Sequence, residues 1–108
     1  MISTHILDTH LGQPAANVVV QLLDENGAIL ATAQTNADGR ITQEAFGLKT
    51  LQAGNYSLDF AIADYFKSLY INTFFPKAVI HFKVEETAQH YHIPLLMSAF
   101  SYSTYRGS

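Results

Sequence analysis

The stretch HYHIPLLMSAFSYSTYRGS, residues 90–108, decides the fold. Its pattern is typical of an apolar strand, a tight turn and a second, aromatic-rich strand that runs up to the last residue. Chain ends usually fray into small polar residues, so this pattern predicts a C-terminal hairpin that is docked on the rest of the protein. Two of the five histidines and the run Tyr105-Arg106-Gly107-Ser108 lie in this stretch. We therefore expect the chain end to form part of a functional site.

The segments upstream predict further short strands. Alternating or β-branched apolar patterns favour strands over residues 3–8, 17–23, 28–35, 55–61 and 78–84. The Asn-Gly and Asp-Gly pairs at 26–27 and 38–39 mark tight turns. Apolar residues at 62, 65, 66 and 69 predict one short helix, whereas 41–54 is expected to be irregular with a short strand. Together these segments predict an all-β fold, an antiparallel two-sheet β-sandwich of seven to eight strands with one short helix.

The composition limits the classes of protein that fit. A chain of 108 residues suits a single domain, 1–108, with one core. Apolar residues make up 48% and charged residues 14%, which predicts a packed domain and favours self-association. With a net charge of −3 and six scattered Lys and Arg residues, the chain has no basic stripe for nucleic acid. The absence of cysteine excludes disulfides, thiolate metal sites and cysteine nucleophiles.

The start of the chain lacks the basic and apolar regions of a signal peptide. No apolar run approaches the ~20 residues of a membrane-spanning helix. We therefore expect no membrane partner and a cytoplasmic location, with the periplasm left open for a processed chain.

Three histidines are candidates for chemistry. Side chains alternate along a strand, so His90 and His92 share one face while Tyr91 and Ile93 share the other. The apolar face fits the core better, which directs both histidines outward, and His5 lies on the less apolar face of its own strand. Taken alone, each of these histidines is typical of an ordinary surface residue. A zinc site is an alternative for the three, but no acidic or thiol ligand lies nearby in the sequence.

Two stretches carry a resemblance to a known family. Residues 5–16, HILDTHLGQPAA, with the hydrophobic strand that follows them, resemble the N-terminal signature of the transthyretin family. Residues 90–108 resemble its C-terminal signature, specifically the branch that ends in Tyr-Arg-Gly-Ser and hydrolyses 5-hydroxyisourate. Order, spacing and length agree over about residues 2–108, and the tail distinguishes this branch from the hormone carriers.

The resemblance implies a β-sandwich that assembles as a homotetramer, a dimer of dimers, with active sites in a channel where dimers meet. It implies a small-molecule substrate and neither cofactor nor metal. The implied catalytic residues are His5, Arg40, His92 and Ser108, and the implied substrate-binding residues are Tyr105, Arg106 and Gly107. His90 falls outside the matched catalytic position.

The implied reaction converts 5-hydroxyisourate to 2-oxo-4-hydroxy-4-carboxy-5-ureidoimidazoline, the step after urate oxidation. Imidazole titrates near neutral pH, so His5 or His92 would be the general base for water, and the other would orient substrate or protonate the leaving nitrogen. Arg40 suits an anionic ring and a developing oxyanion. Ser108 offers a hydroxyl and a terminal carboxylate that could hold substrate or water.

Two other classes of function compete with the hydrolase. A non-catalytic tetrameric carrier would hold a small aromatic ligand in the same channel, and it predicts small and apolar residues in place of His5, Arg40 and His92. A sandwich used for adhesion would need exposed recognition loops, and the loops here are short.

Overall fold

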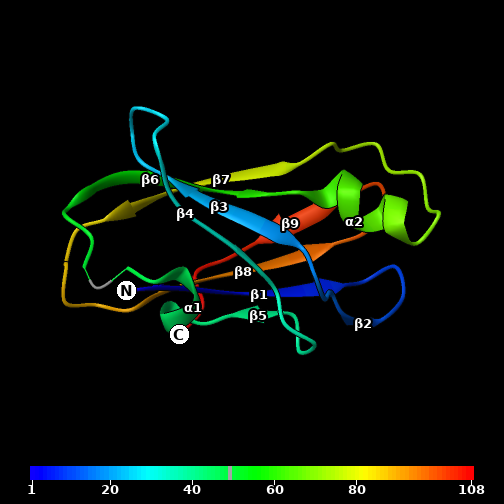
Figure 1. Cartoon of the computed structure of the whole chain (residues 1–108), viewed down its shortest axis with the longest axis horizontal. Coiled ribbons are helices and arrows are strands. Elements are labelled where there is room, and N and C mark those ends of the chain that lie inside the picture. Colours follow the sequence, from blue (N-terminus) through cyan, green and yellow to red (C-terminus); the bar gives the residue numbers. More distant parts are fainter. Residues whose placement is uncertain (49) are drawn as a thin grey trace.

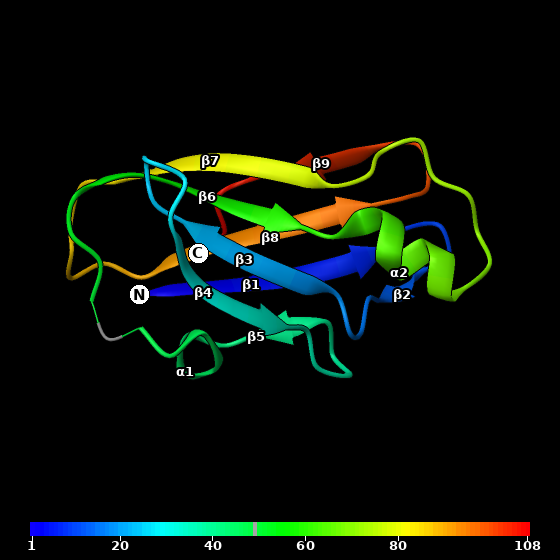
Figure 2. The ribbon, with the colours of Figure 1, turned by 45° about the horizontal axis from the view of Figure 1, so that its top comes forward.

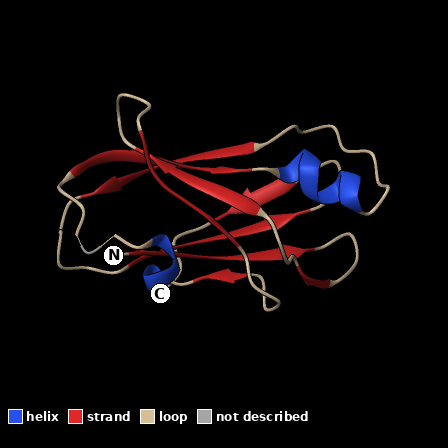
Figure 3. Ribbon diagram, in the orientation of Figure 1, coloured by secondary structure: helices blue, strands red, loops and turns tan. Residues whose placement is uncertain are grey.

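In the part of the chain that the structure describes, two β-sheets face each other and two helices lie outside them (Figures 1 and 3). The computed structural model describes residues 1–48 and 50–108. One sheet has the order β2-β1-β8-β9, with β5 also paired to β1, and the other has the order β4-β3-β6-β7. The elements are β1 (Ile2–Asp8), β2 (Gln13–Pro14), β3 (Val19–Leu23), β4 (Ile29–Gln34), β5 (Arg40–Ile41), α1 (Gln43–Phe46), β6 (Gly54–Phe60), α2 (Ile62–Ser68), β7 (Ala78–Val84), β8 (Tyr91–Met97) and β9 (Tyr102–Thr104). Neither helix of the described chain has the length and apolar character needed to cross a lipid bilayer.

The predicted β-sandwich is confirmed, with differences in detail. The described residues form nine strands where seven to eight were expected, because β2 and β5 have only two residues each and show no periodicity in the sequence. The sheets are otherwise antiparallel, but β1 and β8 pair in parallel over seven residues. Strand β9 ends at Thr104, short of the last residue, and the tail continues to a single bridge between Gly107 and His92.

Residues 41–54 were expected to be irregular with a short strand, but they contain a second helix, α1. Residue 49 of this segment lies outside the described residues. The signals for α1 are local. The Thr42 hydroxyl caps the helix by accepting a hydrogen bond from the Ala45 N–H (3.2 Å), and Gly47, with φ of 74°, ends it. Four residues are too few to show a helical apolar period, so the sequence pattern missed it.

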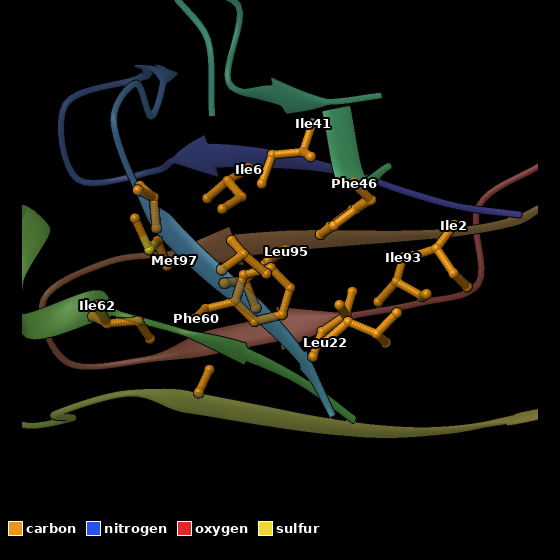
Figure 4. Close-up of a cluster of buried hydrophobic side chains, with 14 of the residues drawn as sticks. Ile2, Ile6, Leu22, Ile41, Phe46, Phe60, Ile62, Ile93, Leu95 and Met97 are labelled. Carbon is orange, nitrogen blue, oxygen red and sulfur yellow. The ribbon is translucent and has the colours of Figure 1, made fainter. Parts of the chain in front are cut away.

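The core lies between the sheets and uses one face of each central strand. Ile6 of β1 and Leu95 of β8 face Leu22 and Phe60 of the opposite sheet, and all four side chains are fully buried (Figure 4). Burial of each such side chain contributes roughly 1.5–3 kcal/mol. Because alternate residues point to opposite faces, the intervening residues of β1 and β8 are left on the outer face of their sheet.

A buried carboxylate connects the end of β1 to α2. Asp8 is fully buried, and its two oxygens accept hydrogen bonds from the Tyr65 hydroxyl (2.7 Å) and the Leu11 N–H (2.9 Å). Burial, followed by the neighbouring Asp8 carboxylate, raises the pKa of Tyr65. The phenol therefore stays protonated and available as the donor that the carboxylate needs.

Tyr65→Phe is expected to lower the free energy of unfolding by about 1–3 kcal/mol, because one oxygen of the buried Asp8 carboxylate loses its donor. Urea unfolding at neutral pH measures the change. Tyr70→Phe, at a residue that is 98% exposed, is the matched control and should change stability by less than about 0.5 kcal/mol. Equal stability of the two variants would contradict the role given to this contact.

Candidate active site

Three adjacent strands, β5, β1 and β8, carry the basic residues predicted for the site (Figure 2). His5 of β1 is paired with Arg40 of β5, and Ser3 of β1 is paired with His92 of β8. Paired residues on adjacent strands project to the same face, with Cβ atoms about 4.5–5.5 Å apart in an antiparallel pair. The core takes the alternate residues of β1 and β8, as predicted, so these four side chains share the outer face of the sheet.

The turn before β5 brings Arg40 into place. Gly39 has φ of +74°, and a Cβ there would lie 2.5 Å from the Ile6 carbonyl oxygen. The Ile6 N–H donates a hydrogen bond to the Gly39 carbonyl (2.7 Å), which holds this turn against β1. Glycine is therefore required for the turn to approach β1 closely enough for β5 to pair with it.

A pocket of about 360 Å³ opens on this face. Its lining includes three of the predicted catalytic residues, Arg40, His92 and Ser108. The other lining residues are Ser3, Thr4, Ile41, Thr42, Gln43, Glu44 and His90. His5 is not among the lining residues, although its strand position opposite Arg40 keeps it beside the pocket.

A larger depression, of about 530 Å³, lies by the turn between β3 and β4 and is lined in part by His81 and Lys83. It contains none of the predicted site residues. The chemistry predicted from the sequence therefore corresponds to the smaller pocket.

The C-terminal tail reaches the pocket through Gly107. The Gly107 N–H donates to the His92 carbonyl (2.9 Å), which places Ser108 at the pocket. A Cβ on residue 107 would lie 2.5 Å from His92 Cδ2, so only glycine fits against this imidazole without a shift. Both chain ends lie near α1 (Figure 1).

Two predicted substrate-binding residues lie elsewhere. Tyr105 and Arg106 line a second depression of about 280 Å³ together with residues of β7 and with Tyr91, His92 and Ile93 of β8. The Arg106 guanidinium lies 4.9 Å from the Tyr91 ring centroid and donates to the Gln89 side-chain carbonyl (3.0 Å). In a single chain, Tyr105 and Arg106 therefore do not line the pocket of Arg40 and Ser108, although His92 borders both depressions.

The structure adds residues that the sequence did not single out. Ser3 Oγ lies 2.7 Å from both His90 Nε2 and His92 Nδ1, and His90 Nδ1 lies 3.2 Å from Gln43 Oε1. The available signal for Ser3 was its place on the same strand face as His5. No such signal existed for Gln43, because α1 was not predicted.

The surroundings favour the uncharged forms of His5 and His92 by lowering the pKa of each. Burial lowers the pKa of His92, and the nearby charges of Arg40, His90 and His5 lower this pKa further. Burial and then Arg40 also lower the pKa of His5, against a smaller raising effect of the Asp38 carbonyl and carboxylate. Each imidazole thus retains a basic lone pair at neutral pH. Within residues 1–48 and 50–108, no three His, Asp or Glu side chains are grouped so as to hold a metal ion.

Comparison with known proteins gives one consistent result. The model of the HIUase/Transthyretin family matches residues 2–107. The 5-hydroxyisourate hydrolase of Salmonella dublin is 41% identical over 111 residues, which cover 100% of this chain and 81% of that protein. The solved structure of Klebsiella pneumoniae 5-hydroxyisourate hydrolase has a TM-score of 0.90 and 41% identity, covering 99% of this chain and 97% of its own. Transthyretin from Sparus aurata has a TM-score of 0.84 and 29% identity, covering 98% and 95%.

The hydrolases and the transthyretin share the fold, and the identity to the hydrolases is higher. The match extends over nearly the whole chain in sequence and in structure, and the chain belongs to the HIUase/transthyretin family.

Proposed function

We propose that this protein hydrolyses 5-hydroxyisourate to 2-oxo-4-hydroxy-4-carboxy-5-ureidoimidazoline by histidine-assisted attack of water on a ring acyl carbon. The observation that carries the proposal is the pocket that combines His92, an imidazole whose pKa is lowered by burial and by Arg40, with the permanent cation Arg40 itself and with Ser108. The similarity over the full chain to proteins named 5-hydroxyisourate hydrolase supports the substrate.

Each residue type suits one part of the reaction. His92 removes a proton from water as the water oxygen bonds to the acyl carbon, and the proton is returned to the ring nitrogen as the carbon–nitrogen bond breaks. Arg40 binds the anionic substrate and stabilises the negative charge that develops on the carbonyl oxygen. His5, opposite Arg40, orients the substrate, and the Ser108 hydroxyl holds substrate or water. We assign the base to His92 because His92 lines the pocket and His5 does not.

The carrier alternative needs a different lining. A site that only holds a small aromatic ligand is expected to be mainly apolar with few polar groups. Most of the residues that line this pocket are polar or charged, so its chemistry favours a reaction over simple retention.

The deciding experiment follows the absorbance of freshly generated 5-hydroxyisourate with and without the protein, and identifies the product by NMR. Accelerated decay to the ureidoimidazoline supports the hydrolase. Saturable binding with an unchanged rate of decay would instead support the carrier.

We propose further that the protein is a homotetramer, a dimer of dimers. Phe74 and Phe100 are 74% and 69% exposed, and they lie together at the β8–β9 turn because the Phe74 N–H donates to the Ala99 carbonyl (2.9 Å). Exposed aromatic side chains grouped in this way are typical of contact surfaces. Light scattering after gel filtration should give about four times the 12.0 kDa chain mass, and a monomer mass would contradict the proposal.

The lowered pKa of His92 predicts how activity depends on pH. Because the neutral imidazole is the active form, kcat/KM should fall only below a midpoint that is lower than about 6.5, the ordinary value for histidine. Arg40→Gln removes a positive charge that lowers this pKa, so the midpoint should move up toward about 6.5 along with a loss of rate. Arg40→Lys keeps the charge and should keep the low midpoint.

The lowered pKa values of His5 and His92 also affect the stability of the fold. Between the lowered folded pKa and about 6.5, the unfolded chain binds more protons than the folded chain, so the free energy of unfolding decreases as the pH falls through this range. Histidine proton resonances titrated by NMR measure the pKa values directly. A wild-type midpoint at or above the ordinary value would contradict both expectations.

A further inference from the structure

A chain of hydrogen bonds runs from His92 through residues that have no role in the proposed reaction. His92 Nδ1 lies 2.7 Å from Ser3 Oγ, which lies 2.7 Å from His90 Nε2. His90 Nδ1 lies 3.2 Å from Gln43 Oε1, and Gln43 Nε2 lies 3.4 Å from Glu44 Oε1. Of these groups, only His92 has a role in the proposed reaction, so the other four have no assigned purpose.

The direction of the chain follows from which groups can donate. Gln43 Nε2 is the amide nitrogen and donates to the Glu44 carboxylate, which leaves Gln43 Oε1 toward His90. A carbonyl oxygen only accepts, so the hydrogen in this contact belongs to His90 Nδ1. In its neutral form, His90 then has a lone pair at Nε2.

The Ser3 hydroxyl has one hydrogen to share between two imidazoles. It must donate to the lone pair of His90 Nε2, and its oxygen is then left to accept from His92 Nδ1–H. Every donor in the chain points the same way, from His92 toward the carboxylate of Glu44. With its hydrogen on Nδ1, the neutral His92 ring carries its basic lone pair on Nε2.

We propose that Ser3, His90 and Gln43 are positioning residues that hold His92 in the Nδ1–H tautomer and so reserve its Nε2 as the base for water. The inference rests on the proposed function only in assigning His92 as that base. The hydrogen bond at one ring nitrogen of a histidine sets the chemistry of the other. Because the partner here is a neutral hydroxyl, we expect its loss to lower kcat by about 10- to 100-fold, less than the ~10⁴ seen when a catalytic histidine is held in the wrong tautomer.

The direct test reads the tautomer of His92 in the full-length protein without substrate. Two-bond nitrogen–proton correlations of ¹⁵N-histidine protein separate protonated from unprotonated ring nitrogens, and His92→Asn assigns the His92 signals. The wild type should show hydrogen on Nδ1 of His92 and on Nδ1 of His90. Ser3→Ala should move hydrogen on His92 toward Nε2, whereas Ser3→Thr, which keeps a hydroxyl, should preserve the wild-type tautomer.

Ser57→Ala is the matched control. Ser57 is likewise a strand serine with a side-chain hydrogen bond, to Asp59 Oδ1 at 3.2 Å, but it lies on β6 of the other sheet. It should leave both the His92 tautomer and kcat unchanged. Gln43→Ala changes the far end of the hydrogen-bonded chain, in the short helix α1, and leaves position 3 as it is. It removes the acceptor for His90 Nδ1–H, so His90 should no longer be held in the Nδ1–H tautomer.

The kinetic readout separates positioning from binding. Ser3→Ala should lower kcat with KM changed by less than about twofold, and Ser3→Thr should restore kcat. Hydrogen on Nε2 of His92 in the wild type, or an unchanged tautomer in Ser3→Ala, would overturn the inference even if the protein hydrolyses 5-hydroxyisourate. Failure of hydrolysis with the expected tautomers would instead reject the proposed function and leave the hydrogen-bonded chain in place.

Discussion

Replacing His92 with asparagine is expected to lower kcat/KM for 5-hydroxyisourate by about 10²- to 10⁴-fold, the usual contribution of a general base. Asparagine is planar and polar and can still bond to Ser3, but its amide does not take up a proton near neutral pH. The folded state should therefore survive while proton transfer from water is lost. Steady-state kinetics and urea unfolding of the same preparation measure the two effects.

The control for His92→Asn is His81→Asn. His81 is an exposed histidine on β7 of the other sheet; it borders the depression of Tyr105 and Arg106 that His92 also borders, but it does not line the pocket of Arg40 and Ser108. This variant should retain activity within about twofold. If His92→Asn hydrolyses substrate at nearly the wild-type rate, His92 is not the base, and His5 becomes the candidate.

Gly107→Ala is expected to lower kcat by about 10²-fold through displacement of a catalytic group. The added methyl would lie 2.5 Å from His92 Cδ2 and 3.3 Å from the His92 carbonyl oxygen. The imidazole would have to move, and the 2.7 Å contact between its Nδ1 and Ser3 would be disturbed. Alanine at this position meets no positive φ, so the effect on folding should be smaller than the effect on the rate.

Gly27→Ala separates this steric effect from a general loss of stability. Gly27 has φ of +82° with open space around it, so alanine there should cost about 1–2 kcal/mol of stability without touching the pocket. The folded Gly27→Ala protein should keep its kcat. Equal rates for wild type and Gly107→Ala would show that the tail does not position His92.

Periodicity along the chain predicted a large part of the fold. The alternation in residues 3–8 and 91–95 correctly assigned the core face, and it therefore directed Ser3, His5 and His92 outward. The spacing of apolar residues in 62–70 correctly predicted α2. These predictions succeeded because a strand or helix that packs on one side must repeat its apolar residues with the period of its own backbone.

The extra elements and the division of the tail could not be predicted in this way. Strand β5 and helix α1 are too short to show a period, and they depend on close approach to β1 and on a local cap. Tyr105 and Arg106 follow β9 and turn toward Tyr91 and β7, while Ser108 reaches the pocket. Neighbours in sequence thus line different depressions, which have His92 in common.

The sequence by itself determined the class of fold, the outward faces and the kinds of side chain available for chemistry, since these depend on local backbone periodicity and on residue type. Only the tertiary structure decided which of these side chains meet. Ser3 and His92 are 89 positions apart, and they touch because β1 and β8 pair in parallel in one register. A period of two specifies the face on which a residue lies but not which strand lies beside it, because pairing is chosen by the packing of the whole sandwich.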